Sequence, residues 1–428
     1  MAEARKVLVF PAGTEIAFEI HHALRSSKFV KLYGATSVAC HADFVFENCV
    51  EGLPYVDEPE LVDQLNQVID KLGIDYVYPA HDSAVLVLTR EQARLHAPVV
   101  TSDLETVEIC RSKNLTYDYV RGAEYLPRFY AGVEEIEKYP VFIKPSVGQG
   151  SVGARRVDDR AALEEALSDG VEYAICEYLP GQEFTVDCFT DRHGALRYVG
   201  PRSRDRIRSG IAVRSHFLPE DSRINEIAED LNRRFRFNGA WFFQLKENSQ
   251  GQFRLMEVAP RIAGTMGASR NRGVNMPLLT LYNMWGYDVE ILNNGNDLLL
   301  DRAFISRFKT GIHYENVYVD YDDTLALRGQ ANPELLAFLY QARNHGKKLF
   351  LISKHEGDLG EALNRLCIHP GLFDRIIHLN QRESKLPYIL PDSIFIDDSF
   401  AERWRIHQGC GVPVFDLDMI ESLLDWRA

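Results

Sequence analysis

The sequence has no C-x-x-C cysteine pair, no G-x-x-x-x-G-K-[ST] motif and no long apolar run. Its seven cysteines are scattered and odd in number, which favours reduced, mostly buried thiols over disulfides or zinc ligands. The apolar segment Val7 to Phe10, which follows the first charged residues, is too short for a signal peptide or a membrane span. We therefore expect a cytoplasmic protein with no membrane partner.

Positive charge is also scarce. Lys and Arg number 48 against 62 Asp and Glu, a formal net charge of -14. Such a chain repels a phosphate backbone unless a local basic patch overrides the overall field, so we expect no nucleic-acid partner. No low-complexity tract is present, and 428 residues exceed what one hydrophobic core usually supports. The chain should therefore fold throughout, as several domains.

The pattern of apolar residues changes twice along the chain. Short β-branched runs alternate with helical spacing up to about Val100, which predicts an open parallel sheet. After a helical linker, hairpin-like strands follow from Val141, and strand-helix alternation returns at Val317. We predict a multidomain α/β and α+β protein with domains at 1-102, 103-312 and 313-428.

A glycine-rich segment runs from Lys144 to Gly153 and contains a formal G-x-G-x-x-G. A dinucleotide-binding fingerprint would open a helix, whereas residues 154-157 continue as a strand, so the glycines are predicted at a hairpin tip. Such a tip can fold over polyphosphate, because absent side chains let backbone N–H groups approach an anion. Taken alone, the pattern is equally typical of a turn.

The order of motifs around this segment resembles the ATP-grasp superfamily, and within it the carboxylate–amine ligase branch that includes carbamoyl-phosphate synthetase halves and biotin carboxylase. The resemblance covers about Lys6 to Asn293 and implies a Rossmann-like domain ahead of the ATP-grasp fold. Two lysines would contact the ATP phosphates, the loop would cover them, residues 177-179 would contact adenine, and a glutamate would bind ribose. The residues implied are Lys113, Lys144, Ser146, Gly148, Gly150, Ser151, Glu177, Leu179 and Glu183.

A later hairpin would supply the metal ligands. Two apolar strands turn at residues 248-252 and bring Gln244 and Glu257 to one side. By the resemblance these two hold Mg²⁺ or Mn²⁺, and Arg261 binds the transferred phosphate or acyl phosphate. The sequence departs from the commoner pattern at Ala259, where an Asn usually supplies another ligand. The number of metal ligands therefore stays open.

Five arginines form the single basic cluster: Arg202, Arg204, Arg206, Arg208 and Arg214. A charge run is usually a solvated face. This one lies between the expected adenine segment and metal strand, where the ATP-grasp resemblance implies the site of the acidic substrate, so we favour a carboxylate or phosphate clamp with Arg204, Arg208 and Arg214 as contacts. Met266 and Gly267 are candidates for the acceptor pocket, although Met266 could equally be core.

The C-terminal part contains a second motif set. An apolar strand from Val317 ends in D-x-D-x-T, and two carboxylates one residue apart suit a nucleophile and an acid/base that share Mg²⁺. This part resembles the haloacid-dehalogenase (HAD) phosphohydrolases over about 316-424, without room for a cap domain. The implied catalytic residues are Asp320, Asp322, Ser353 and Lys385, and the implied metal residues are Asp320, Asp322, Asp397 and Asp398.

We therefore interpret the chain as an ATP-dependent ligase that activates a carboxylate as an acyl phosphate for attack by an amine, coupled to a HAD-type phosphohydrolase. ATP and Mg²⁺ are the expected cofactors, small-molecule carboxylates and amines the expected partners, and a homodimer stays open. The main alternative is a phosphatase whose N-terminal unit binds nucleotide as a sensor. A bicarbonate-using carboxylase and a nucleic-acid end-processing enzyme are two further alternatives.

Overall fold

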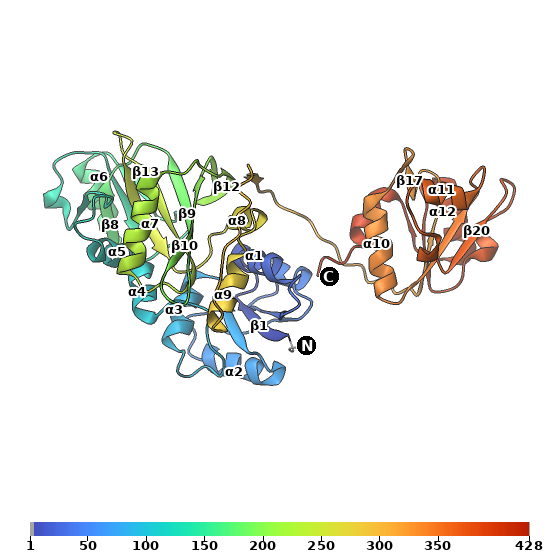
Figure 1. Ribbon diagram of the computed structural model, residues 1–428, viewed down its shortest axis with the longest axis horizontal. Helices are drawn as coiled ribbons and strands as arrows, with labels where there is room; N and C mark the ends of the chain where they lie inside the picture. Colours follow the sequence, from blue (N-terminus) through green and yellow to red (C-terminus); the bar gives the residue numbers. More distant parts are fainter. Residues whose placement is uncertain (1–3, 428) are drawn as a thin grey trace. The chain divides into compact units, whose positions relative to one another are not determined.

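A computed structural model describes residues 4–427 of the chain (Figure 1). The chain forms two compact units that meet between Phe304 and Ile305. The two domains predicted for residues 1-312 thus lie largely in one unit, and the break comes earlier than the predicted residue 312. All cysteines are free, but only Cys176 and Cys188 are buried, so the expectation of mostly buried thiols is wrong. Within 4–427 no helix is long and apolar enough to cross a membrane.

The first unit begins with the predicted parallel sheet, whose strand order is β3-β2-β1-β4. Its strands are β1 (Arg5–Phe10), β2 (Val30–Ala35), β3 (Cys49–Val50) and β4 (Tyr76–Pro79), and its helices are α1 (Glu15–Leu24), α2 (Leu61–Leu72) and α3 (Asp82–Arg90). Strand β1 is buried from Val7 onward because helices cover both faces. The carboxyl ends of β1 and β4 therefore direct the starts of α1 and α3 to the same edge of the sheet.

Two helices lead to a small antiparallel sheet that carries the glycine loop. The helices are α4 (Leu104–Arg111) and α5 (Lys113–Tyr119), followed by β5 (Phe129–Tyr130), β6 (Val141–Pro145), β7 (Arg155–Val157), α6 (Arg160–Leu167) and β8 (Tyr173–Glu177). The sheet order is β5-β8-β6-β7. Strands β6 and β7 pair antiparallel, so the glycines lie at a hairpin tip as predicted.

The largest sheet of the unit is antiparallel, in the order β10-β9-β13-β14. Its elements are β9 (Glu183–Thr190), β10 (Leu196–Ser203), α7 (Ser222–Arg234), β13 (Gly239–Glu247) and β14 (Phe253–Ala259), and α8 (Gly267–Asn271) and α9 (Met276–Met284) follow it. Trp241 stacks on Phe237 at 4.0 Å between ring centroids, within the core beneath α7. A separate small sheet joins β11 (Arg206–Arg208), β12 (Ile211–His216) and β15 (Leu299–Asp301).

The second unit is a five-stranded parallel sheet in the order β20-β19-β16-β21-β22, flanked by helices. Its elements are β16 (Asn316–Val319), β17 (Ala326–Leu327), β18 (Gln330–Ala331), α10 (Pro333–Asn344), β19 (Lys348–Ser353), α11 (Leu359–Arg365), β20 (Arg375–His378), β21 (Ser393–Ile396), α12 (Phe400–Cys410) and β22 (Val414–Phe415). The described residues also form the 3-10 helices η1 (His41–Phe44), η2 (Val133–Glu135), η3 (Pro370–Leu372), η4 (Leu386–Tyr388) and η5 (Leu417–Ser422).

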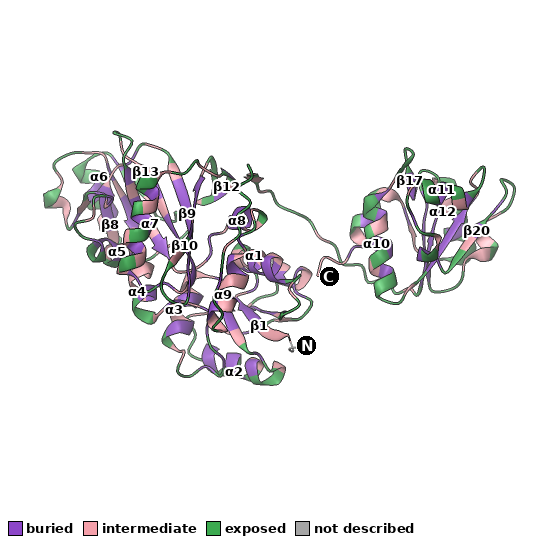
Figure 2. Cartoon of the chain, in the orientation of Figure 1, coloured by how far each residue is buried: buried purple, intermediate pink, exposed green. Residues whose placement is uncertain are grey.

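Burial follows the layers in both units. The central strands are buried, whereas the outer helices are exposed on one side (Figure 2). In the second unit, β16 is buried at every position, as expected for a central parallel strand with helices on both faces. Residue Asp320 follows this strand directly, so its carboxylate lies at the carboxyl edge of the sheet.

Candidate functional site

The glycine loop, residues 146-153, is anchored at its first residue. Ser146 is buried, its hydroxyl lies 2.9 Å from the Ser112 hydroxyl, and its carbonyl accepts a 2.8 Å hydrogen bond from the Lys113 backbone N–H. Ser112 is also the N-cap of α5. The loop and the start of α5 therefore form one connected structure, and Ser146 serves as its anchor.

Three cationic side chains surround this loop. Lys113 Nζ and Arg111 Nη1 each lie 3.4 Å from the Gly148 carbonyl oxygen, and the buried Lys144 donates a 2.7 Å hydrogen bond to the Met256 carbonyl. Burial lowers the pKa of both lysines, although Glu257 acts in the opposite direction on each. The two ammonium groups are largely removed from water and have few carboxylates near them. An anion bound beside them would therefore be stabilised.

Glu257 and Gln244 come from neighbouring strands. They are directly paired across β13 and β14, so their side chains lie on the same face of the sheet, as predicted. Glu257 lines a cavity together with Lys113, Gly148 and Arg261. The structure thus brings a carboxylate, an ammonium group, a guanidinium and the glycine loop into one cavity.

Arg261 is held by a residue that the sequence did not single out. Asp82, at the start of α3, accepts 2.6 Å hydrogen bonds from its Nε and Nη2, and the two side chains are only 18% and 14% exposed. Burial by itself would raise the pKa of Asp82, but the charge and hydrogen bonds of Arg261 outweigh it and hold this pKa below its ordinary value. In sequence, an acidic residue at a helix start indicates no more than a favourable helix dipole.

A second cavity shares Tyr117 and Met256 with the first. Phe142 and Leu179 give it apolar walls, and Glu183 lies at its edge. Lys246 at 2.8 Å and Arg204 at 3.3 Å contact Glu183. Burial would raise the pKa of Glu183, but these two cations outweigh it and lower the pKa, so the residue is a carboxylate at neutral pH. An apolar slot beside a cationic cavity suits a flat ring attached to an anionic chain.

Glu177 also lines the second cavity, and its side chain accepts a 2.9 Å hydrogen bond from the Arg128 backbone N–H. That bond ties β8 to the residue ahead of β5. Gly150 and Ser151 lie at the far tip of the glycine loop, both with positive φ (61° and 58°). All nucleotide-assigned residues therefore lie along the loop and the two cavities, but Ser146 and Glu177 use their side chains within the protein.

The five arginines do not form one clamp. Arg202 is fully buried in a bidentate pair with Asp187, and Arg204 pairs with Glu183. Arg206 and Arg214 both contact Asp301, at 2.7 and 3.5 Å. Arg208 instead stacks over Phe304. The acidic partners are distant in sequence, so the order of residues alone does not separate these arginines. Met266 is fully buried in the core, so it does not line an acceptor pocket.

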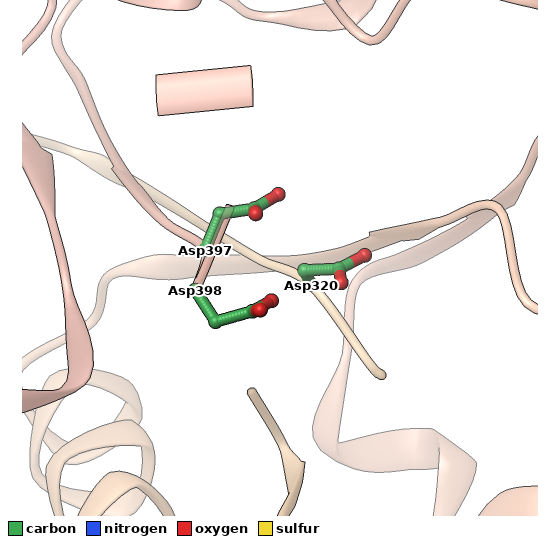
Figure 3. A group of neighbouring side chains, drawn as sticks. All are labelled: Asp320, Asp397 and Asp398. Atoms are coloured by element: carbon green, nitrogen blue, oxygen red, sulfur yellow. The ribbon is translucent and has the colours of Figure 1, made fainter. Parts of the chain in front are cut away.

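The second unit carries a compact acidic cluster. One carboxylate oxygen from each of Asp320, Asp397 and Asp398 can be chosen so that all lie within 4.8 Å of one another (Figure 3). The buried Lys385 donates 2.7 Å hydrogen bonds to Asp320 and Asp397. Asp322 lies outside this group, half-exposed, with its carboxylate 2.8 Å from His355 Nδ1. Ser353 ends β19 and is buried.

Burial controls the ionisation of this cluster. It raises the pKa of Asp397 to about 6 and also raises that of Asp320, although Lys385 opposes both shifts. Burial would lower the pKa of Lys385, but the two carboxylates outweigh it and raise this pKa. Oxygen ligands from two strand ends suit Mg²⁺, and the cation would replace Lys385 as their counter-charge or join it.

Comparisons with known proteins address the first unit. A family model described as "ATP-grasp in the biosynthetic pathway with Ter operon" matches residues 171–297. The carbamoyl phosphate synthase large chain of Clostridium acetobutylicum is 24% identical over 45% of this chain and 19% of its own length. A D-alanine–D-alanine ligase of Clostridium botulinum is 26% identical over 30% of this chain and 48% of its own. The chain thus spans less than half the length of either relative.

Solved structures agree with these matches. The biotin carboxylase domain of the Hydrogenobacter thermophilus 2-oxoglutarate carboxylase, solved as a dimer with MgADP, ADP and bicarbonate, superposes with a TM-score of 0.56 at 15% identity, covering 68% of this chain and 71% of that one. The first unit therefore has the ATP-grasp fold. The predicted resemblance to the ATP-grasp superfamily is confirmed at this level.

Proposed function

We propose that the first unit binds Mg·ATP and spends it to join a carboxylate to an amine. The observation that carries the proposal is that Lys113, Glu257 and Arg261 line one cavity, while Lys144 lines the neighbouring apolar slot, which shares Tyr117 and Met256 with that cavity. The triphosphate would lie in the cationic cavity and adenine in the apolar slot. The similarity to a D-alanine–D-alanine ligase supports this class of reaction.

In this proposal each residue has a distinct task. Lys113 and Lys144 would bind the phosphates of ATP, and Glu257 with Gln244 would hold Mg²⁺, which would supply positive charge beside the phosphates. A substrate carboxylate oxygen attacks the γ-phosphorus, and the bond to ADP breaks. The amine then attacks the acyl carbon, phosphate leaves, and the amine proton passes to solvent. Arg261 holds the phosphoryl oxygens during both steps.

The remaining nucleotide contacts lie further along the cleft. Glu183 would accept hydrogen bonds from the ribose hydroxyls, and the backbone between Glu177 and Leu179 would bind the adenine edge. Ser146 would anchor the glycine loop beside the phosphates. Gly148, Gly150 and Ser151 would offer backbone N–H groups to the phosphates.

The test is ADP formation with a panel of amino acids and organic acids. Wild type should form ADP with at least one acid–amine pair, and Glu257→Gln should reduce the rate by about 100-fold or more because the metal contact is lost. Glu164→Gln, an exposed residue of α6, is the matched control and should keep the wild-type rate. A nucleotide-sensing role, the alternative that Ala259 favours, would give Mg·ATP binding without ADP formation under any pair.

The acidic cluster carries a second candidate function. We propose that the second unit is a Mg²⁺-dependent phosphohydrolase of the HAD kind. Asp320 would attack the phosphorus of a phosphate ester, Asp322 would protonate the leaving alcohol, and water would then release inorganic phosphate. Asp397 and Asp398 would hold the metal beside Asp320, while Ser353 and Lys385 would bind the phosphate oxygens.

Phosphate release from a panel of phosphate esters tests this second function. Asp320→Asn should abolish release, whereas Asp374→Asn, at the opposite end of the sheet, should not change it. Absence of release from every ester by the wild type, in the presence of Mg²⁺, would contradict a phosphohydrolase role.

A further inference from the structure

A third cavity of the first unit contains none of the residues assigned above to the binding of ATP or of the metal. It lies between the β11–β12 hairpin, residues 301–304 and the start of α1. We call it the hairpin cavity. Ile207, Ile211 and Phe304 line it and are 41%, 41% and 88% exposed. Exposed apolar side chains gathered in one concave site indicate a binding surface.

One of the charged side chains that line the hairpin cavity has no ion-pair partner among the described residues. Three arginines and two carboxylates line it. Arg206 pairs with Asp301, and Arg302 pairs with Glu15. Arg208 forms no ion pair with any residue of 4–427, and its guanidinium lies over the Phe304 ring at 5.1 Å from the centroid. A guanidinium stacked by its face keeps its N–H edge available for a carboxylate.

The hairpin cavity adjoins the proposed phosphate site. Gly210, at the hairpin tip, lies so close to Gly150 that an added Cβ would overlap the Gly150 carbonyl. Arg204, which contacts Glu183 of the nucleotide slot, also donates a 3.0 Å hydrogen bond to the Gly210 carbonyl. The hairpin tip therefore touches the glycine loop on one side and borders the hairpin cavity on the other.

We infer that the hairpin cavity binds the carboxylate substrate, and that this substrate has an apolar body. The inference rests on the proposed ligase function for its biological meaning, but not for its binding chemistry. Arg208 would pair with the carboxylate of the incoming acid, while Phe304, Ile207 and Ile211 would cover the apolar body. An acid without an apolar body would lose the second set of contacts.

Direct binding tests the inference without any turnover. The probe is 3-phenylpropanoate, titrated into the full chain by calorimetry, with the uncharged 3-phenylpropanamide and the compact dicarboxylate succinate as comparison ligands. The acid should bind, and both comparison ligands should bind at least about tenfold more weakly, because each lacks one of the two interactions.

Two substitutions assign the interactions. Arg208→Gln should weaken 3-phenylpropanoate at least about tenfold and leave the amide unchanged, and Phe304→Ser should weaken both. Arg223→Gln is the matched control, because Arg223 is also exposed and stacked on an aromatic ring, at 4.7 Å from Phe253, but lies outside the cavity. Equal binding of acid and amide, or unchanged binding by Arg208→Gln, would overturn the inference.

The inference and the proposed function fail separately. Probe binding that depends on Arg208, in a protein that forms no ADP with any acid, would preserve the site and reject the ligase. ADP formation with apolar acids whose Michaelis constants do not change in Arg208→Gln would preserve the ligase and reject the hairpin cavity as its acid site.

Discussion

At the scale of single residues, the pair between Asp82 and Arg261 fixes the direction of the guanidinium. Asp82 occupies Nε and Nη2, and Nη1 donates a 2.9 Å hydrogen bond to the Ile262 carbonyl. The pair also joins α3, from the parallel sheet, to the segment after β14 of the antiparallel sheet. Asp82 is therefore a positioning residue for Arg261 and a cross-link between two layers of the first unit.

Loss of this cross-link should destabilise the first unit. Because a buried guanidinium would be left without its carboxylate, Asp82→Ala should lower the free energy of unfolding by about 3 kcal/mol. The measurement is guanidinium denaturation followed by Trp241 and Trp285 fluorescence, in a background where Trp404 and Trp426 are phenylalanine. Asp63→Ala, at a 74% exposed partner of Arg94, should change stability by less than about 0.5 kcal/mol.

The stability that Asp82 contributes should depend on pH in one direction. The pKa of Asp82 is lowered in the folded protein, so its contribution is complete above the ordinary value of about 3.9 and is lost as pH falls through the lowered pKa. The stability difference between wild type and Asp82→Asn should be constant from neutral pH to about pH 5 and shrink only in stronger acid. A difference that vanished at pH 6 would contradict the assignment.

Replacement of Lys144 should weaken the binding of Mg·ATP without lowering the stability of the fold. Its ammonium group is buried, and burial lowers its pKa, so the charged form is unfavourable without a ligand. Lys144→Met should keep or increase the free energy of unfolding while it weakens Mg·ATP binding at least about tenfold. Lys138→Met, on the exposed surface, should change neither quantity. A stability loss above about 2 kcal/mol would mean that Lys144 is structural.

At the scale of elements, two hairpin tips meet above the proposed phosphate site. Ser151 and Gly150 of the β6–β7 loop, and Ser209 and Gly210 of the β11–β12 hairpin, all have positive φ. An added Cβ on Gly210 would overlap the Gly150 backbone. The close approach therefore requires glycine, and the position of one tip constrains the other.

A pair of glycine substitutions isolates this contact. Gly210→Ala and Gly251→Ala share the cost of a side chain at positive φ, about 1 kcal/mol, because their φ values are 75° and 71°. Only Gly210→Ala should raise the dissociation constant of Mg·ATP, since nothing lies within 4 Å of a Cβ on Gly251. Equal affinities in the two variants, measured by calorimetry, would show that the tips do not act together.

Local sequence patterns predicted the strands and hairpins well. They could not predict the parts of the site that depend on contacts between residues far apart in the sequence. The β6–β7 hairpin and the cross-strand pair of Gln244 and Glu257 follow from strand periodicity and one turn. Asp82 and Arg111 could not be found this way, because their roles depend on residues far along the chain. The five arginines of the basic cluster contact different partners, and local patterns could not predict these partners for the same reason.

At the scale of the whole molecule, the two units have separate hydrophobic cores. Among the described residues, the three largest core clusters of the first unit contain only residues before Phe304, and both clusters of the second unit contain only residues after Ile305. Each unit therefore has a hydrophobic core of its own, and we expect each to fold by itself.

Separating the chain at this boundary should preserve both sites. A fragment of residues 1–304 should bind Mg·ATP with the affinity of the full chain, and a fragment of 305–428 should retain the Mg²⁺-dependent phosphate release proposed for the acidic cluster. Circular dichroism and thermal melts would report folding. An unfolded 1–304 fragment would mean that the second unit stabilises the first, against the division of the cores.

Titration of the full chain with Mg·ATP by calorimetry tests the central claim most directly, because Lys113, Lys144 and Glu257 are argued to form a nucleotide site whatever the acid or amine. The account predicts saturable binding of one Mg·ATP per chain, weakened at least about tenfold by Lys144→Met and unaffected by Lys138→Met. No saturable binding by the wild type, or equal binding by both variants, would contradict it.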